Sequence, residues 1–277
     1  MDLDGRLLLG TSSFSSKDWC GVFYPEKLPQ KEMLRHYATR FPAVEIDSTF
    51  YGTPTEKTVL GWKERVPPGF QLSVKMPELI THEKMLEDCD EELATFLKVM
   101  DLLEDRLGPI LLQFQYFKKT DIPLPDFMQR LVKFLPKLPR DRRFAVEVRN
   151  KPLVTPRYLD LLRQHGCAFT LIDHPWFERP GTLMARYDVI TADFCYVRWL
   201  GDRYAIEEIT KNWGKVVVDR ASEMDEWAKV IAQLLAKNVR VYAFANNHYS
   251  GHAPSAVELF RKALERYLAG LKLESGN

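Results

Sequence analysis

Cysteine is scarce in this sequence and follows no recognisable pattern. The 277 residues contain four cysteines, with no CxxC pair and no spacing typical of a zinc site. They are Cys20, Cys89, Cys167 and Cys195. Scattered cysteines are typical of free thiols in a reducing compartment, so we expect no disulfide framework and predict a cytoplasmic protein.

Charge of one sign and long apolar runs are also missing. The formal net charge is +1, which gives no overall attraction to nucleic acid or anionic lipid. No apolar run approaches the ~20 residues that span a bilayer, and the acidic first residues lack the basic start of a signal peptide. Neither GxGxxG nor GxxxxGK[ST] occurs. The sequence therefore predicts no membrane partner and no cofactor.

What the sequence has is a regular succession of short apolar or β-branched runs, which are typical of buried strands. These runs cover residues 7–12, 43–47, 70–75, 109–114, 144–149, 167–173, 194–199 and 240–246. Helical periodicity follows most of them, at 31–41, 93–107, 126–135, 156–165, 222–237 and 254–271, whereas 175–193 has no convincing helix. Alternating strands and helices imply parallel pairing. Eight units predict one (β/α)8 barrel with a C-terminal helix, a single domain over residues 1–277.

Every predicted strand ends in side chains that can ionise or form hydrogen bonds. In order along the chain they are Ser12, Glu45 and Asp47, Lys75, Gln113, Glu147 and Arg149, Asp173, Arg198, and Asn246 and Asn247 with His248. In a (β/α)8 barrel the carboxyl ends of the strands converge on one mouth, where active sites are found. We therefore expect a site at that mouth.

Strand alternation sharpens this prediction, because successive side chains point to opposite faces. In three predicted strands the apolar positions form the outward set, so that Glu45, Lys75 and Glu147 point inward. We expect Glu45 to meet Lys75, and Asp47 to shape the turn that presents Tyr51. Buried charges of opposite sign must pair or bind a ligand. Two interpretations follow: a closed ion-pair network of Glu45, Lys75, Glu147 and Arg149, or a ligand site, which the sequence favours.

Six segments also carry a resemblance to a known family. They are residues 44–51, 70–75 with Thr81-His82, 112–114, 145–149, 196–198, and Asn246-Asn247 with Gly251 and Ala253. Together they resemble the YecE-like family, a bacterial and archaeal domain of unknown function, in order from about Leu8 to about Leu264. The resemblance implies a TIM-like barrel and no established activity.

Two motifs differ from the family pattern. Residues 198–201 read Arg-Trp-Leu-Gly where the family commonly has Arg-Leu-His-Gly, and residues 150–153 lack the aromatic that usually follows the fifth strand. A mechanism that depends on the missing histidine therefore does not hold for this chain.

The charges at the predicted mouth favour an enzyme that acts by acid–base chemistry on a small phosphate- or carboxylate-bearing molecule, sugar- or nucleotide-like. Arginine forks and lysine bind anions, and carboxylates and histidine transfer protons. The predicted catalytic residues are Glu45, Lys75, His82, Glu147 and Asp173. The predicted substrate-binding residues are Ser12, Asp47, Tyr51, Gln113, Arg149, Arg198, Asn246 and Asn247, and no metal ligand is predicted.

Alternative functions stay open. One is a metal-dependent hydrolase or isomerase that uses the carboxylates with His82 or His248, although the cations of the same mouth repel a metal ion. A second is a glycosidase with Glu45 and Glu147 as its carboxylate pair. Its sugar-stacking residues are expected among Trp19, Tyr24, Tyr51 and Trp176.

The third alternative is a nucleic-acid-binding or endonuclease-like barrel. Lysines and arginines near the mouth supply the basic surface that such a function needs. They are Lys17, Lys118, Lys119, Arg203 and Lys211. The near-neutral net charge disfavours this function, and the sequence leaves the oligomeric state open.

Overall fold

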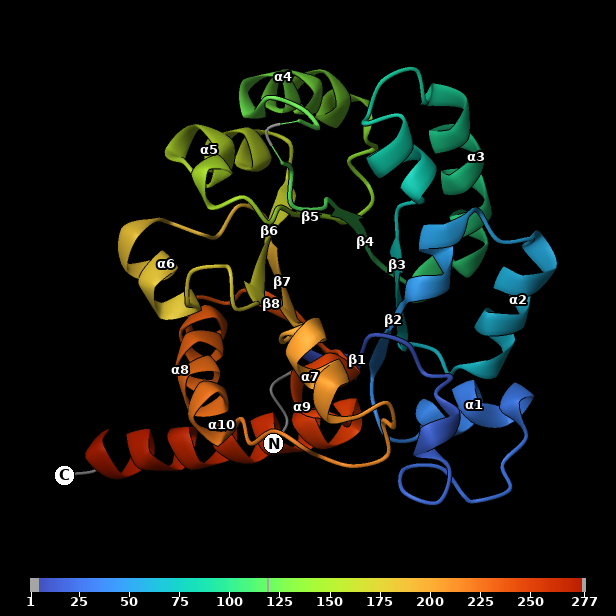
Figure 1. Cartoon of the computed structure of the whole chain (residues 1–277), viewed down its shortest axis with the longest axis vertical. Coiled ribbons are helices and arrows are strands. Elements are labelled where there is room, and N and C mark those ends of the chain that lie inside the picture. Colours follow the sequence, from blue (N-terminus) through green and yellow to red (C-terminus); the bar gives the residue numbers. More distant parts are fainter. Residues whose placement is uncertain (1–4, 119, 276–277) are drawn as a thin grey trace.

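Eight parallel strands form a ring that helices surround (Figure 1). The computed structural model describes residues 5–118 and 120–275. The strands are β1 (Leu7–Thr11), β2 (Ala43–Ile46), β3 (Gln71–Lys75), β4 (Leu107–Gln113), β5 (Phe144–Glu147), β6 (Cys167–Asp173), β7 (Phe194–Trp199) and β8 (Arg240–Ala245). Their order is β1-β8-β7-β6-β5-β4-β3-β2. The predicted (β/α)8 barrel is confirmed.

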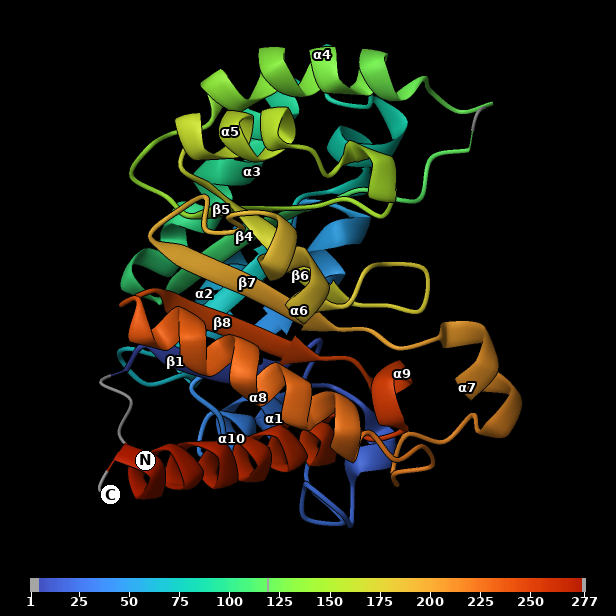
Figure 2. The same ribbon diagram turned by 90° about the vertical axis from the view of Figure 1, so that its left-hand side faces the viewer.

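The helices lie outside the strands and follow them along the chain. They are α1 (Met33–Tyr37), α2 (Glu56–Arg65), α3 (Asp90–Met100), α4 (Leu124–Phe134), α5 (Pro156–Gln164), α6 (Pro180–Arg186), α7 (Arg203–Ile209), α8 (Ala221–Ala236), α9 (Asn247–Ser250) and α10 (Ala253–Ser275). The long α10 packs against α8, β1 and β8, and α7 extends beyond the sheet on the side where the strands end (Figure 2). In the described part of the chain, no helix is long and apolar enough to cross a membrane.

Side chains that cap the first turn of a helix explain where three of the helices begin. Thr55 and Thr155 each accept a hydrogen bond from the backbone N–H three residues later, at 3.2 Å, at the starts of α2 and α5. Asp202 accepts one from Ala205 N at 3.1 Å at the start of α7. These oxygens satisfy backbone donors that have no partner within the helix, and so fix where each helix begins.

Two regions differ from the sequence prediction. Residues 93–107, predicted as one helix, contain the end of α3, then 3-10 turns over Asp101–Arg106, then the start of β4. Glu104 has φ 50° and ψ −124°, which interrupts any helix at this point. In residues 175–193, where no helix was predicted, α6 forms over seven residues, with Pro180 at its start and Leu183 buried. So short a helix shows too few turns for periodicity to indicate it.

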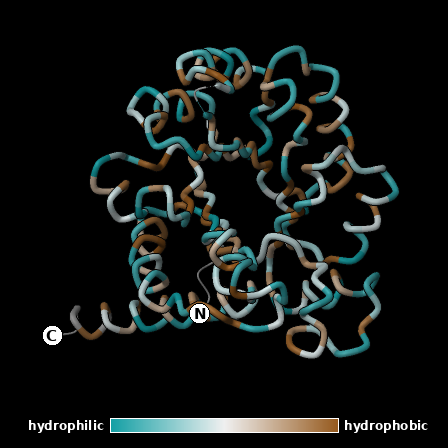
Figure 3. The backbone as a smooth tube through the Cα atoms, viewed as in Figure 1, coloured by the Kyte–Doolittle hydropathy of each residue, from teal (hydrophilic) through white to brown (hydrophobic). Residues whose placement is uncertain are grey.

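The apolar side chains form two clusters. The larger one lies between the outer faces of the strands and the helices, and outward turns of the chain are mostly hydrophilic (Figure 3). The smaller one fills the inside of the barrel, with Leu8, Ala43, Leu111, Ala145, Ala168, Phe194, Tyr196, Tyr242 and Phe244. Phe244 is in register with Arg198, whereas the other members of this inner cluster come earlier in their strands. The remaining inward positions nearest the carboxyl ends of the strands can therefore be polar.

The barrel closes between β1 and β2 through an unusual seam. A single bridge joins Ser12 to Glu45, with Ser13 N donating to the Glu45 carbonyl oxygen at 2.8 Å. Further down the seam, the Tyr37 hydroxyl accepts a hydrogen bond from Thr11 N at 2.8 Å and donates to the Ala43 carbonyl oxygen at 3.2 Å. A Cβ on Gly10 would lie 2.1 Å from that oxygen, so only glycine fits here. A side chain thus takes the place of strand-to-strand pairing.

Replacing Tyr37 with phenylalanine should therefore destabilise the protein by about 1–3 kcal/mol, because a buried backbone donor and acceptor lose their partner. Urea unfolding measures the change. Tyr158→Phe is the matched control, since the Tyr158 hydroxyl is equally buried and has no hydrogen-bond partner among the described residues. Equal losses of stability in the two variants would show that the seam does not depend on the hydroxyl.

Candidate functional site

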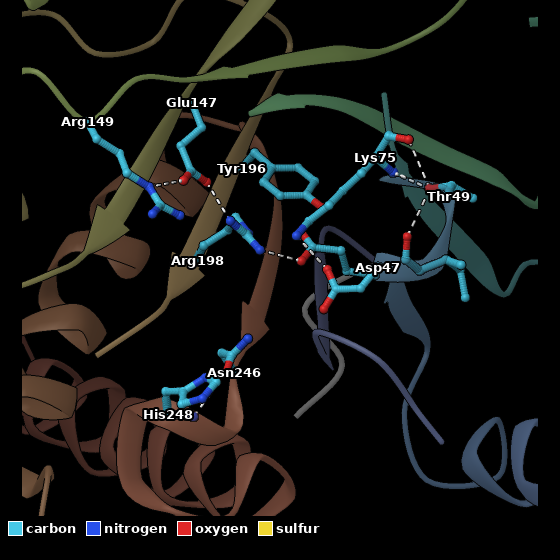
Figure 4. A network of polar contacts seen from close by, with 11 residues as sticks. Asp47, Thr49, Lys75, Glu147, Arg149, Tyr196, Arg198, Asn246 and His248 are labelled. Atoms are coloured by element: carbon cyan, nitrogen blue, oxygen red, sulfur yellow. Dashed lines mark hydrogen bonds and ion pairs between the residues drawn. The ribbon is translucent and has the colours of Figure 1, made fainter. Parts of the chain in front are cut away.

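Four charged side chains lie inside the barrel near the carboxyl ends of the strands. Lys75 on β3, Glu147 on β5 and Arg198 on β7 are labelled in Figure 4, and Glu45 on β2 pairs with Arg198. Their neighbours along the strands belong to the outer core, namely Val44, Ile46, Leu72, Val74, Val146, Val148, Val197 and Trp199. This alternation confirms the predicted inward and outward faces of β2, β3 and β5.

At the centre of this group Arg198 reaches between two glutamates. Its Nη2 lies 2.7 Å from Glu45 Oε1, and its Nη1 lies 2.7 Å from Glu147 Oε2. All three side chains are almost completely buried. The Tyr196 hydroxyl donates to Glu45 Oε2 at 2.7 Å, and Arg149 Nε donates to Glu147 Oε1 at 3.1 Å. All four carboxylate oxygens therefore have a donor.

This pairing decides the charge of both glutamates. Burial on its own raises the pKa of Glu45, but the nearby charges of Arg198 and Lys75 and the hydrogen bonds from Arg198 and Tyr196 lower it to about 2. The pKa of Glu147 is also lowered, because Arg198 and Arg149 outweigh its burial. Both carboxylates are ionised at neutral pH, so neither can serve as the general acid of a glycosidase.

Arg198 is correspondingly fixed as a cation. Burial disfavours its charge, but the two carboxylates outweigh burial and raise its pKa further above the ordinary value. The three residues therefore form a buried ion triad that links β2, β5 and β7. The inward charges do form an ion-pair network, with Arg198 at its centre. Lys75 pairs with Asp47 and not with Glu45, the partner that the sequence predicts.

Lys75 and Arg149 lie above the triad, closer to solvent. Lys75 Nζ pairs with Asp47 Oδ1 at 2.6 Å, and the Lys75 side chain is 12% exposed. The Thr49 hydroxyl lies 2.9 Å from both Lys75 N and Lys75 O, which fixes the end of β3 against the turn after β2. Arg149, 30% exposed, uses only its Nε to contact Glu147. Among the described residues, no acceptor contacts its two Nη groups.

His82 lies on the π-helical turn Leu79–Glu83 that follows β3, where the charges of Arg149 and Lys75 act on it. Its Nδ1 lies 2.8 Å from the Thr81 hydroxyl, and its ring meets Phe50 edge-on at 5.0 Å. Burial, then the charges of Arg149 and Lys75, lower the pKa of His82. The imidazole is therefore neutral at neutral pH, as a proton acceptor must be.

The sequence prediction missed a second histidine, His174, one residue beyond β6. The ring packs against Trp176 at 5.3 Å, and Nδ1 accepts from Trp176 N at 3.3 Å. Burial and the charge of Arg149 lower its pKa. Strand alternation could have found it: Phe169 and Leu171 are outward, so Asp173 is outward as well and His174 is inward.

Asp173 accordingly lies outside the barrel, away from the triad. Its Oδ1 accepts from Arg179 at 2.7 Å, and its Oδ2 accepts from Trp227 Nε1 at 2.7 Å and from the Tyr249 hydroxyl at 2.9 Å. These donors join β6 to α8 and α9. The structure thus gives Asp173 a place in packing between strand and helices.

Asn246, Asn247 and His248 lie together at the start of α9. In Figure 4, Asn246 and His248 lie apart from Arg198 and Glu147. Asn246 Oδ1 accepts from His248 N at 2.9 Å and caps the helix. Asn247 Oδ1 accepts from Trp19 Nε1 at 3.2 Å and from Ala253 N at 3.0 Å. His248 Nε2 lies 3.0 Å from Glu207 of α7. Their polar atoms therefore mainly hold α7, α9 and the loop after β1 together.

The remaining predicted residues occupy the seam and the rim. Ser12 lies beside Glu45 across the seam, and its hydroxyl is buried with no partner among the described side chains. Gln113 at the end of β4 is in register with Glu147 and is half-buried. Tyr51 is 77% exposed, on the turn that follows β2. The structure thus brings Ser12 and Gln113 to the level of the triad and leaves Tyr51 in solvent.

The aromatic residues expected to stack on a sugar divide in the same way. Trp19 and Tyr24 are buried and pack against each other and against Phe23, so they anchor the loop after β1. Trp176 is 56% exposed. Of the expected platforms, only Tyr51 and Trp176 present a ring to solvent.

The donor set at the mouth does not fit a divalent cation. Within residues 5–118 and 120–275, no group of three or more His, Cys, Asp or Glu side chains is arranged to hold a metal ion. Glu45 and Glu147, the carboxylates nearest the barrel axis, both pair with Arg198. Asp47 pairs with Lys75. Calcium and magnesium need several oxygen ligands, and these oxygens must not already be paired with a cationic side chain.

The chain matches the model of a known family, "Protein of unknown function DUF72", over residues 8–275. YunF of Bacillus subtilis is 23% identical over 267 residues, which cover 90% of this chain and 92% of that protein. YecE of Escherichia coli is 34% identical over 118 residues, so the aligned part spans only 41% of its length and 42% of this chain.

Solved structures show the same fold. A DUF72 family protein from Thermotoga maritima has a TM-score of 0.73 and 28% identity, covering 94% of this chain and 99% of that one. A DUF72 family protein from Enterococcus faecalis has a TM-score of 0.67 and 21% identity, covering 94% and 97%. A glycoside hydrolase family 5 enzyme from Prevotella bryantii, at 12% identity and a TM-score of 0.51, shares only the barrel fold. Because the family model matches nearly the whole chain, the protein belongs to the DUF72 family of proteins of unknown function, as its YecE-like motifs predict.

Proposed function

We propose that this protein is an enzyme that binds a small phosphate- or carboxylate-bearing substrate at the carboxyl-terminal mouth of the barrel. Lys75 and Arg149 bind the anionic group, and His82 accepts or returns a proton. The buried triad fixes Arg149 from below through Glu147. A sugar- or nucleotide-like substrate places its remaining polar groups near Ser12 and Gln113.

The observation that carries this proposal is the state of Arg149. Glu147 fixes its Nε, while its two Nη groups have no acceptor among the described residues. A guanidinium held at one edge and free at the other is suited to bind two oxygens of a phosphate or carboxylate. Lys75 adds a second charge from β3, and Asp47 holds it in place.

Proton transfer is assigned to histidine because the buried glutamates are fully occupied. Both oxygens of Glu45 and of Glu147 accept hydrogen bonds, so neither carboxylate is free to take a substrate proton. His82 is neutral and lies close enough to Arg149 and Lys75 for their charges to lower its pKa. A bound anion opposes those charges, which raises the pKa of His82 and makes it a better base.

Replacing Arg149 with glutamine should weaken binding of inorganic phosphate and of simple phosphomonoesters about 10- to 100-fold, because a charge-assisted contact is lost. Lys75→Met should weaken it to a similar extent. Isothermal titration calorimetry at constant ionic strength measures the affinity. Arg261→Gln is the control, since Arg261 lies on α10 and pairs with Glu258.

Nuclear magnetic resonance of the histidine ring protons gives a second readout of the same site. At a phosphate concentration that just saturates the wild-type protein, the pKa of His82 should rise there and should rise much less in Arg149→Gln, which binds phosphate more weakly. If phosphate, phosphomonoesters and carboxylates bind equally well to the wild type and both variants, the mouth is not the anion site.

A single strand of nucleic acid is the second candidate, and one observation favours it. Four exposed aromatic side chains, Tyr51, Tyr116, Trp176 and Tyr204, all follow the carboxyl ends of strands, as stacking platforms do. Lys118, Arg203 and Lys211 lie in the same connections, whereas Lys119 lies outside the described residues. This candidate requires an affinity for oligonucleotides that falls steeply with salt. Affinity that is independent of salt contradicts it.

A cytoplasmic location is part of the proposal. The four cysteines are unpaired, and burial raises the pKa of Cys167 and of Cys195 to about 12, so these thiols are unreactive. Free thiols of this kind support a reducing compartment. Fractionation of cells that express the tagged protein tests it.

A further inference from the structure

A cavity lies at the opposite end of the barrel from the mouth. It has a volume of about 600 Å³ and opens where β4 to β7 begin. Its walls come from the turns before these strands, including Arg140, Arg143 and His165, and Leu107 adds a partly exposed apolar side chain. We call it the N-terminal cavity.

Most of the acids that line the N-terminal cavity are already neutralised. Arg142 pairs with Asp101 at 2.6 Å and with Asp141 at 2.6 Å. Glu104 pairs with Lys63 at 2.7 Å. Three carboxylates therefore share two cations, Arg142 and Lys63, and the group has a formal net charge of −1.

Two arginines, by contrast, have no carboxylate partner among the described residues. Arg140 donates only to the Gln164 carbonyl oxygen, at 2.9 Å, which leaves its charge uncompensated. Arg143 is half-buried, and no acceptor in the described part of the chain contacts its guanidinium. Arg143 precedes Phe144, whose side chain packs outward in β5, so Arg143 has the inward position of that strand. Its guanidinium donors are therefore available to a ligand in the cavity.

His165 adds a polar atom without a partner. Its Nδ1 is buried and makes no hydrogen bond with the described residues. Burial and the charge of Arg140 lower its pKa, so that the ring is neutral. Gly166, next to it, has φ +65°, and a Cβ there would lie 3.5 Å from Arg140 Nη1. Glycine suits this backbone conformation, and Arg140 lies within ordinary contact distance of it.

We propose that the N-terminal cavity binds a small phosphomonoester. Arg140 and Arg143 contact the phosphate oxygens, and Leu107 contacts the apolar part of the ligand. Asp193, which is exposed and has no partner for its carboxylate among the described residues, is placed to accept from a hydroxyl of the ligand. The site is separate from the mouth and does not depend on the function proposed for it.

Phosphate and glycerol phosphate binding to Arg149→Gln protein tests this proposal, because binding at the mouth is weakened in that background. Titration calorimetry should still detect one site, and a further Arg143→Gln substitution should weaken it at least about tenfold. Arg143→Gln should leave the thermal unfolding midpoint without ligand unchanged, since Arg143 has no partner to lose among the described residues. Arg261→Gln in the same background is the control.

The outcomes separate the two sites. If Arg149→Gln alone removes all binding, or if adding Arg143→Gln has no more effect than adding Arg261→Gln, the N-terminal cavity is not a phosphate site and the proposal is overturned. Binding that survives Arg149→Gln and is lost with Arg143→Gln supports it, whatever the result at the mouth.

Discussion

Replacing Arg198 with methionine should destabilise the protein by about 3–5 kcal/mol at pH 7, because Glu45 and Glu147 would then be buried without a counter-charge. That is a large share of the roughly 5–15 kcal/mol that stabilises a typical domain. No comparable cation is available among the described residues, since Lys75 pairs with Asp47 and Arg149 reaches only Glu147. Urea unfolding at pH 7 measures the loss, and circular dichroism shows whether the variant still folds.

The matched control removes the whole triad. In Arg198→Met with Glu45→Gln and Glu147→Gln, no buried charge of the triad remains unpaired, so most of the lost stability should return. The amide that replaces the Glu45 carboxylate retains an oxygen that accepts from Tyr196. If Arg198→Met alone changes stability by less than about 1 kcal/mol, water must reach the glutamates and the triad is not buried as described.

Low pH should destabilise the folded protein, because the glutamates of the same triad become protonated. The pKa of Glu45 is about 2 in the folded state and 4.5 ordinarily, so the folded state binds its proton less readily than the unfolded state. Its stabilising contribution is complete above pH 4.5 and is lost as the pH falls towards 2. The drop in pKa corresponds to about 3 kcal/mol, and the lowered pKa of Glu147 acts in the same direction.

Urea midpoints measured between pH 7 and pH 3 test this dependence. The wild-type protein should lose stability steeply below pH 4.5, and Glu45→Gln should show a shallower slope over the same range. Arg198→Met should behave in the opposite way, because burial without Arg198 raises the pKa of both glutamates and favours their protonated forms. Parallel curves for the wild type and Glu45→Gln would assign acid unfolding to other carboxylates.

The fold was predictable from the sequence because each strand is a short β-branched or apolar run. The predicted runs at 167–173 and 194–199 coincide with β6 and β7. The boundaries failed where local structure depends on a few residues, as at Glu104, whose positive φ ends the helical region before β4. The seam could not be predicted, because it depends on how close Gly10 comes to Ala43 and on where the Tyr37 hydroxyl lies.

The sequence predicted which charged side chains point into the barrel, but it did not predict which of them form ion pairs. Alternation along β2, β3 and β5 placed Glu45, Lys75 and Glu147 inside the barrel, and the structure agrees. Which cation meets which acid depends on depth and side-chain length: Arg198 reaches two strands at once, whereas Lys75 ends near Asp47. The same alternation applied to β6 would have predicted that His174 points inward and that Asp173 does not.

The triad also imposes an order on assembly during synthesis. Glu45 and Glu147 leave the ribosome before Arg198 does, so a partial barrel that ends at β6 holds two carboxylates without the cation that pairs with both of them. Collapse of that partial barrel around its axis would bury both carboxylates without Arg198, which is unfavourable. We therefore expect the interior to become dry only after β7 has added Arg198, and the ring to close with β8 against β1 after that.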